Sequence, residues 1–341
     1  MSALTVARRG RLAGAVIPAA AIAIAGIVVA QSGAQAASRG PALHAGPKIS
    51  LGSTSNVFAQ SFTQAPDGAV YYSHGSVVSV VKGNAAPKTA VYAGHAVQAL
   101  AASSSDLFVE TGLTVTEYRR SDYKALRHFT LSTPVKPITE AGLISGAGNT
   151  LWSWTDWATD ESGFEFATVS RINTATSAVH VVSKYGFPSP DGYAAGSNGL
   201  YFQSNPPSGT YLDNATPGGA LHARKLSVAE GNPLVLIGGK VELLVFGHHV
   251  TVNTYSSSLA PLTSEQVSVN DATLASADFG LAVLSGSGAA LTVSKLNPAT
   301  GAASGGVHVT GAAVLLSGPD ADVIEVSHDT HGTLTLQRVS S

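Results

Sequence analysis

Short runs of apolar residues, each preceded by a polar turn, recur at similar intervals along the chain. We take the first apolar residue after each turn as a marker, and these markers are Val70, Leu107, Leu151, Leu200, Val241, Leu281 and Val323. Consecutive markers lie 37 to 49 residues apart, with an average near 42. This interval is typical of the four-stranded blades of a β-propeller. The pattern predicts an all-β, seven-bladed β-propeller, and the 49-residue step leaves six or eight blades as alternatives.

The segments on either side of each marker differ in the size of their side chains. Segments before the marker turn are rich in small residues, as in AVQALAA (96–102) and ATLASA (272–277). Such residues suit strands that are crowded around a central axis. Later segments alternate apolar and polar residues, as in LTVSKL (291–296) and LTLQRV (334–339), which is typical of β-strands. We therefore expect the small-residue segments to be the innermost strands.

One strand-like run is left over at the start of the repeat region. The last unit stops after its third strand, at Ser341, and so lacks a fourth. The spare run is Lys48 to Leu51, which precedes the first expected innermost strand at Val57 to Phe62. We expect the spare run to pair with the last unit and close the ring.

The N-terminus has the three parts of a secretory signal. Arginines at positions 8, 9 and 11 precede an uncharged stretch from Leu12 to Ala30, and Ala34 and Ala36 form a small-x-small exit. The alternative is an uncleaved anchor, since a stretch of this length just spans a bilayer. Both alternatives predict a secreted or cell-envelope protein, and a membrane contact follows only if the segment is retained.

These features divide the chain into three parts. Residues 1–36 are the expected signal peptide, 37–46 a flexible lead-in and 47–341 the propeller domain. The whole chain has 341 residues, with 44% hydrophobic residues and no Cys. This composition argues against long disorder and excludes disulfides, thiolate zinc sites and cysteine nucleophiles. A formal net charge of −2 gives no electrostatic footprint for nucleic acid.

Three long connecting segments are expected on one face of the ring. They are residues 155–163, 184–191 and 204–219, which come from neighbouring units. Residues 152–213 also hold 11 of the 23 aromatic residues and six acids. The ligand-binding residues predicted from this gathering are Trp154, Asp156, Trp157, Asp160, Glu161, Tyr185, Phe187, Asp191, Tyr211 and Asp213.

Aromatic platforms beside carboxylates suit sugars, cations or peptides. We therefore expect an extracellular protein, peptide or cell-surface glycan as the partner. The competing interpretation places Trp152 and Trp154 in the packing between blades, Tyr201 and Phe202 in the strand structure, and only Trp157 in an exposed loop.

No catalytic motif stands out in the sequence. The G-x-S-x-G elbow, the H-E-x-x-H pair and the Walker loop do not occur. We predict a non-catalytic binding module with no catalytic residue, metal or cofactor. Two alternatives remain. One is a secreted lyase or hydrolase with an acid/base pair from the loops of this face, for which His328 and His331 are further candidates. The other is a structural component of the cell envelope.

Two strand-turn-strand segments carry a resemblance to known proteins. They are RINTATSAV (171–179) and KLNPATGAA (295–303). Both resemble the signature of secreted bacterial propellers of the YVTN, quinoprotein-like and NHL-like groups, which implies the propeller fold along the whole mature chain. The tryptophan-docking pattern of quinoprotein dehydrogenases is not visible, so the resemblance does not imply a quinone cofactor.

Overall fold

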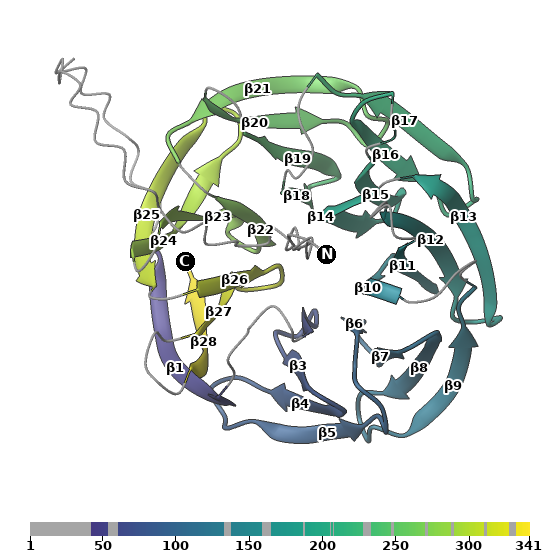
Figure 1. Cartoon of the computed structure of the whole chain (residues 1–341). Helices are drawn as coiled ribbons and strands as arrows, with labels where there is room; N and C mark the ends of the chain where they lie inside the picture. The colour runs from purple at the N-terminus through teal and green to yellow at the C-terminus, as the bar shows by residue number, and fades with distance from the viewer. Residues whose placement is uncertain are drawn as a thin grey trace, which may run out of the picture.

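The chain folds into a ring of β-sheets, as a computed structural model shows. It describes residues 42–53, 61–132, 138–158, 165–186, 188–204, 206, 208–227, 233–246, 249–269, 272–287, 290–309, 312–326 and 332–341. These ranges form seven four-stranded antiparallel sheets arranged radially around an axis (Figure 1). Within them, no helix is long and apolar enough to cross a membrane. The predicted all-β, seven-bladed propeller is confirmed.

We number the blades 1 to 7 from the blade that begins with β2, and count strands from the axis outward. The first strands are β2 (Phe62–Gln64), β6 (Ala99–Ala102), β10 (Ile138–Ser145), β14 (Pro188–Gly196), β18 (Leu234–Ile237), β22 (Thr273–Ala277) and β26 (Ala312–Leu316). Each contacts the first strands of both neighbouring blades, so the seven complete the ring. The small-residue segments are therefore innermost, as predicted, because little space remains where the sheets converge. The first of them begins at Phe62, and residues 57–60 of the expected strand lie outside the described residues.

The second strands contain all seven sequence markers. These strands are β3 (Val70–His74), β7 (Asp106–Thr111), β11 (Thr150–Ala158), β15 (Gly199–Ser204), β19 (Lys240–Val245), β23 (Gly280–Ser287) and β27 (Asp322–Val326). Every marker side chain is at most 2% exposed, because a second strand is covered by the blades on both sides. The apolar run after each turn thus identifies the most deeply buried strand of its blade.

The third and fourth strands lie progressively nearer the rim. The third strands are β4 (Val77–Val81), β8 (Thr114–Arg119), β12 (Glu165–Asn173), β16 (Tyr211–Ala215), β20 (Val250–Tyr255), β24 (Ala290–Asn297) and β28 (Thr333–Ser340). The fourth strands are β5 (Lys88–Tyr92), β9 (Ala125–Thr130), β13 (Ala178–Gly186), β17 (Leu221–Lys225), β21 (Pro261–Val267), β25 (Ala302–Val309) and β1 (His44–Ser53).

The antiparallel order gives the ring two faces. Turns between second and third strands lie on the same face as the segments that lead from one blade to the next, and we call it the connector face. Turns between first and second strands and between third and fourth strands lie on the opposite face. This arrangement follows from the strand order alone.

The three long segments expected on the connector face are shorter than predicted. Strands β11 and β12 pair out to Ala158 and Glu165, so residues 155–158 are strand and not loop. Strands β13 and β14 take up most of residues 184–191 and leave only residue 187 between them. Residues 204–219 include the whole of β16. We predicted loops because the Pro, Gly, Asp and Ser content of these segments is typical of turns. In the folded chain, pairing with neighbouring strands outweighs that local preference.

The ring closes by pairing its two ends, as the spare N-terminal run predicts. Strand β1 joins β28 as the fourth strand of blade 7, with a register that runs from His44 opposite Ser340 to Ser53 opposite Thr333. The strand begins at His44, so residues 44–46 belong to it and not to the lead-in. The Tyr72 hydroxyl of blade 1 donates to the Leu51 carbonyl of β1 at 3.1 Å, which ties the closing strand to the first blade.

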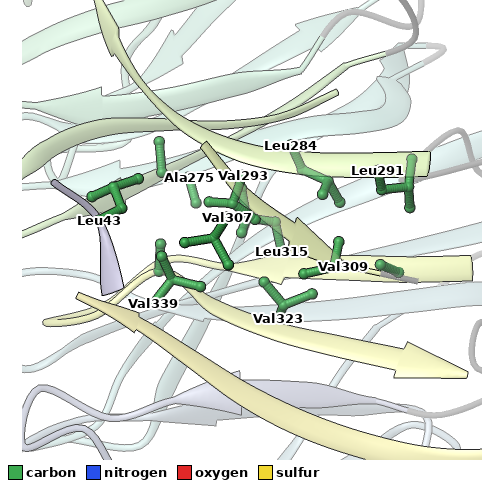
Figure 2. Packing of buried hydrophobic residues seen from close by; sticks show 13 residues of the cluster. Leu43, Ala275, Leu284, Leu291, Val293, Val307, Val309, Leu315, Val323 and Val339 are labelled. Atoms are coloured by element: carbon green, nitrogen blue, oxygen red, sulfur yellow. The ribbon is translucent and has the colours of Figure 1, made fainter. Parts of the chain in front are cut away.

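Leu43 extends this closure toward blade 6. Its side chain is 8% exposed and belongs to an apolar cluster that includes Val307 of β25 and Val339 of β28 (Figure 2). A Cβ atom at Gly305 of β25 would lie 3.5 Å from Leu43 Cγ, so the leucine rests against this strand. Leu43 thereby joins the rims of blades 6 and 7.

Polar contacts hold the seam between blades 7 and 1. Arg338 of β28 donates from Nη2 to the Gly68 carbonyl at 2.8 Å. Gln64 Nε2 of β2 donates to Asp322 Oδ2 of β27 at 2.9 Å, and the Asp322 side chain is fully buried. Burial raises the pKa of the Asp322 carboxyl to about 7, and the nearby Arg338 guanidinium offsets only part of that rise.

Truncation of Leu43 tests the closure. Leu43→Ala removes buried methyl groups between two blades, and we expect it to lower the free energy of unfolding by about 2 kcal/mol. Leu262→Ala is the matched control, because Leu262 lies on the fourth strand of blade 5 and is 50% exposed. Urea denaturation of both variants gives the comparison, and equal stabilities for the two would contradict the closure contact.

Candidate functional site

A cavity lies on the axis of the ring, where the first strands of blades 3 to 7 approach one another. Its volume is about 360 Å³. The apolar side chains that these five strands contribute to its wall include Ile144, Tyr193, Leu236, Leu274 and Leu315. Thr273, Ser276 and Ser317 add hydroxyl groups, and Trp154 adds an indole from a second strand. We call this space the channel cavity.

Two aromatic rings from neighbouring blades form part of the cavity wall. Trp154 of β11 stacks on Tyr193 of β14 with ring centroids 3.7 Å apart and planes inclined by 10°. The indole crosses Gly142 of β10 so closely that a Cβ atom there would lie 1.8 Å from Trp154 Cζ2. Only glycine leaves room for the ring at this point. We call Trp154 and Tyr193 the aromatic stack.

Further from the axis, the Phe202 ring and the buried Asp213 carboxylate follow the aromatic stack between blades 3 and 4. The Phe202 ring lies 6.2 Å from Tyr193, and Asp213 of β16 is directly opposite Phe202. The Asp213 side chain is 3% exposed, and its Oδ2 has no hydrogen-bond partner in the described part of the chain. Burial raises the pKa of the Asp213 carboxyl to about 6, while a hydrogen bond from the Ser204 hydroxyl offsets part of the rise.

A second buried carboxylate lies between blades 2 and 3. Glu110 of β7 is fully buried, and burial raises the pKa of its carboxyl well above the usual range. The Ser153 hydroxyl of β11 offsets part of this rise. Neither Glu110 nor Asp213 belongs to the wall of the channel cavity. Both carboxylates therefore lie in the packing between blades.

The structure places three of the predicted ligand-binding residues in full. Trp154 is 9% exposed and forms part of the aromatic stack, and Asp213 is buried between blades 3 and 4. Tyr211 begins β16 on the connector face, is partly exposed, and donates from its hydroxyl to Ser208 Oγ at 3.2 Å. Trp154 and Asp213 thus lie in the packing between blades 3 and 4, whereas Tyr211 lies at the connector-face end of β16.

The other predicted ligand-binding residues are placed only in part. Asp156 and Trp157 lie on β11, so Trp157 is not the loop residue that we expected. Tyr185 lies on β13, and Asp191 lies on β14 between Ser189 and Tyr193, where the strand register shifts. The side chains of these four residues are outside the described structure. Asp160, Glu161 and Phe187 lie wholly outside it.

The competing core assignments are confirmed for Trp154, which packs between blades 3 and 4, and for three further aromatic residues. Trp152, Tyr201 and Phe202 are at most 2% exposed and pack in the clusters on the two sides of blade 4. The Tyr201 hydroxyl also donates to the Ser257 carbonyl of blade 5 at 2.9 Å. These three aromatic residues hold neighbouring blades together.

The described residues hold no metal-ligating cluster and do not include the acid/base candidates. No group of three or more His, Asp or Glu side chains there is arranged to hold a metal ion. His328 and His331, the candidates for an acid/base pair, lie in the segment 327–331, which is outside the described residues.

Sequence reasoning missed Tyr193 and Gly142 because each gains its role from a residue of a different strand. Tyr193 lies in a small-residue segment that predicts only an inner strand. The available signal was its position as the one aromatic residue in the segment 191–196, since a large ring beside the axis needs space from its neighbours.

Three exposed or partly exposed aromatic side chains lie on the connector face, at separate places around the ring. Tyr92 ends β5 and is 76% exposed, and Phe246 directly follows β19 and is 36% exposed. With Tyr211 they place aromatic rings on this face from blades 1, 5 and 4. The exposed leucines lie elsewhere, on the fourth strands: Leu126 on β9, Leu221 on β17 and Leu262 on β21.

Comparison with known proteins shows the fold and no closer relationship. No protein-family model and no curated protein sequence matches the chain. The β-propeller domain of Cps50 (Swd1) from Myceliophteria thermophila is 12% identical, with a TM-score of 0.60 over 85% of this chain and 98% of that chain. A chain of the mitotic checkpoint complex is 11% identical, with a TM-score of 0.60 over 93% and 100%. BBS1N in complex with ARL6DN is 14% identical, with a TM-score of 0.54 over 87% and 96%.

Alanine at Gly142 tests the aromatic stack. The new Cβ atom overlaps the indole, so we expect Gly142→Ala to lower the free energy of unfolding by about 1–3 kcal/mol. Displacement of the ring toward water also shifts tryptophan emission to longer wavelength. Gly218→Ala is the control, because its Cβ atom would meet nothing closer than 3.8 Å. A Gly142→Ala protein with the stability and emission of the Gly218→Ala control would show that the rings do not stack.

The Asp213 carboxyl makes stability depend on pH. Its folded-state pKa of about 6 lies above the ordinary 3.8, so its contribution is complete below pH 4 and is lost as pH rises through 6. When the pH rises from 4.5 to 8, the free energy of unfolding of the unsubstituted protein should fall by about 2 kcal/mol relative to that of Asp213→Asn. Urea denaturation at both pH values measures the difference, and a difference that does not change with pH would contradict the assignment.

Proposed function

We propose that this chain is an exported, non-catalytic binding module that recognises a protein or peptide on its connector face. The observation that carries the proposal is that Tyr92 and Phe246 are exposed, and Tyr211 partly exposed, on that one face. Tyrosine and phenylalanine are enriched where proteins bind one another, because their rings bury a large area and lose little conformational entropy.

The sequence of one connector-face link favours a partner with basic groups. The chain that links β11 to β12 carries Asp160 and Glu161, and carboxylates complement lysine and arginine side chains across an interface. Aromatic rings add attraction for such cations when the cation lies over the ring face. A basic protein segment with aromatic or aliphatic residues would satisfy both properties.

The similar structures support a binding role only by analogy. One of them, BBS1N, is in complex with ARL6DN, and another belongs to the mitotic checkpoint complex. Propellers of this shape therefore serve in assemblies, although the identities of 11–14% carry no partner over to this chain. Export is supported by the arginines at positions 8, 9 and 11, the apolar stretch 12–30 and the alanines at 34 and 36.

A peptide selection with two matched triple variants tests the proposed surface. A displayed random-peptide library is selected on the immobilised protein, and the affinity of each selected peptide is measured by isothermal titration. We expect Tyr92→Ser with Tyr211→Ser and Phe246→Ser to weaken binding at least tenfold. The control, Leu126→Ser with Leu221→Ser and Leu262→Ser, removes as many exposed apolar residues from the fourth strands.

The outcomes separate the proposed face from its alternatives. Loss of binding in the aromatic variant and retention in the leucine variant support the connector face. Equal binding by the two variants, or loss only in the leucine variant, contradicts it. A failure to select any peptide, together with binding on a glycan array, would contradict a peptide partner.

A further inference from the structure

We propose that the channel cavity is a binding site for a small uncharged molecule with an apolar body and one hydrogen-bond acceptor. This site is separate from the partner surface proposed on the connector face. It lies on the axis and is formed mainly by first strands, whereas Tyr92, Phe246 and Tyr211 lie on or next to second, third and fourth strands.

The size of the cavity suits such a ligand. Small-molecule sites usually have volumes of roughly 300–1,000 Å³. The volume of about 360 Å³ lies at the lower end of this range and corresponds to a compact molecule rather than a folded partner. A single aromatic or alicyclic ring system with short substituents fits this description.

The wall determines the charge of the ligand. Its described residues are Ala, Gly, Ile, Leu, Val, Pro, Trp, Tyr, Ser and Thr, none of which is ionised at neutral pH. Transfer of an ion from water into such surroundings is costly, because no opposite charge compensates the lost hydration. An apolar body gains free energy in the same place by leaving water. The wall therefore selects against ions and favours an uncharged molecule.

Hydroxyl groups of the wall supply the hydrogen-bond donor for the ligand. Thr273 and Ser276 of β22 line the cavity together with Ser317, which follows β26. A hydroxyl group donates one hydrogen bond, so an acceptor on the ligand can pair with it inside the cavity.

The wall is already fixed in shape before any ligand binds. Trp154 is held between Gly142 and the Tyr193 ring, with no space for a Cβ atom at Gly142. Leu236 of β18 is seated in the same way over Gly196 of β14, where a Cβ atom would lie 2.2 Å from Leu236 Cδ2. A pre-formed site loses little conformational entropy on binding, so even a small ligand retains useful affinity.

The neutral dye Nile red is a suitable probe, because it is apolar and carries a carbonyl acceptor. We expect the unsubstituted protein to bind one equivalent, with a blue shift of the dye emission that saturates. Thr273→Phe fills the cavity and should abolish the saturable signal. Thr273→Val keeps the shape of the side chain but removes a hydroxyl donor, and should weaken binding about tenfold. Leu262→Phe introduces the same side chain on the rim and should change nothing.

Two controls keep the test decisive. Circular dichroism and the melting temperature show whether each variant is folded, and Ser276→Phe replaces Thr273→Phe if the latter does not fold. The anionic dye 8-anilinonaphthalene-1-sulfonate should bind at least tenfold more weakly than Nile red. Unchanged Nile red binding in the folded cavity-filling variant, loss of binding in Leu262→Phe, or equal affinity for the anionic dye would overturn the proposal.

Discussion

The pairing of β1 with β28 is the interaction on which the other features of the molecule depend. A propeller blade is stable only when both of its faces are covered, and blades 1 and 7 cover each other only if the ring is closed. The apolar residues between them, such as Tyr72, Ile324 and Leu336, would otherwise face water. The chain has no Cys, so backbone pairing, Leu43 and the Arg338 and Asp322 contacts achieve the closure. The channel cavity exists for the same reason, since its wall needs the first strands of five blades held at fixed positions.

The fold was predictable because the constraint that produces it repeats in every blade. Each second strand is buried on both sides, and this requires an apolar run after a turn at every one of the seven markers. Crowding at the axis likewise requires small residues on first strands. The lengths of connecting segments were not predictable in the same way. Residues 155–158 and β16 have turn-like compositions, and they become strands only because the neighbouring strands supply hydrogen-bond partners.

The sequence predicted features of the candidate site only where they depend on the composition of one segment, and not where they depend on contacts between strands. The dense aromatic content of residues 152–213 falls in blades 3 and 4, where the aromatic stack lies. The contact of Trp154 with Tyr193 involves two blades, and the space for the indole depends on Gly142 of β10. No periodicity within one unit contains that information. Asp213 shows the opposite case, because its charge suggested an exposed ligand group, while its place opposite Phe202 buries it.

An engineered disulfide across the closing strands tests the account most directly. Lys48 of β1 lies opposite Gln337 of β28, and opposed residues of antiparallel strands have Cα separations that suit a disulfide. The closed ring predicts that Lys48→Cys with Gln337→Cys forms an intramolecular disulfide under mild oxidation and raises the melting temperature. Lys48→Cys with Ser264→Cys, on blade 5, should keep two free thiols. A folded Lys48→Cys, Gln337→Cys protein that stays reduced under the same conditions would contradict the closed ring.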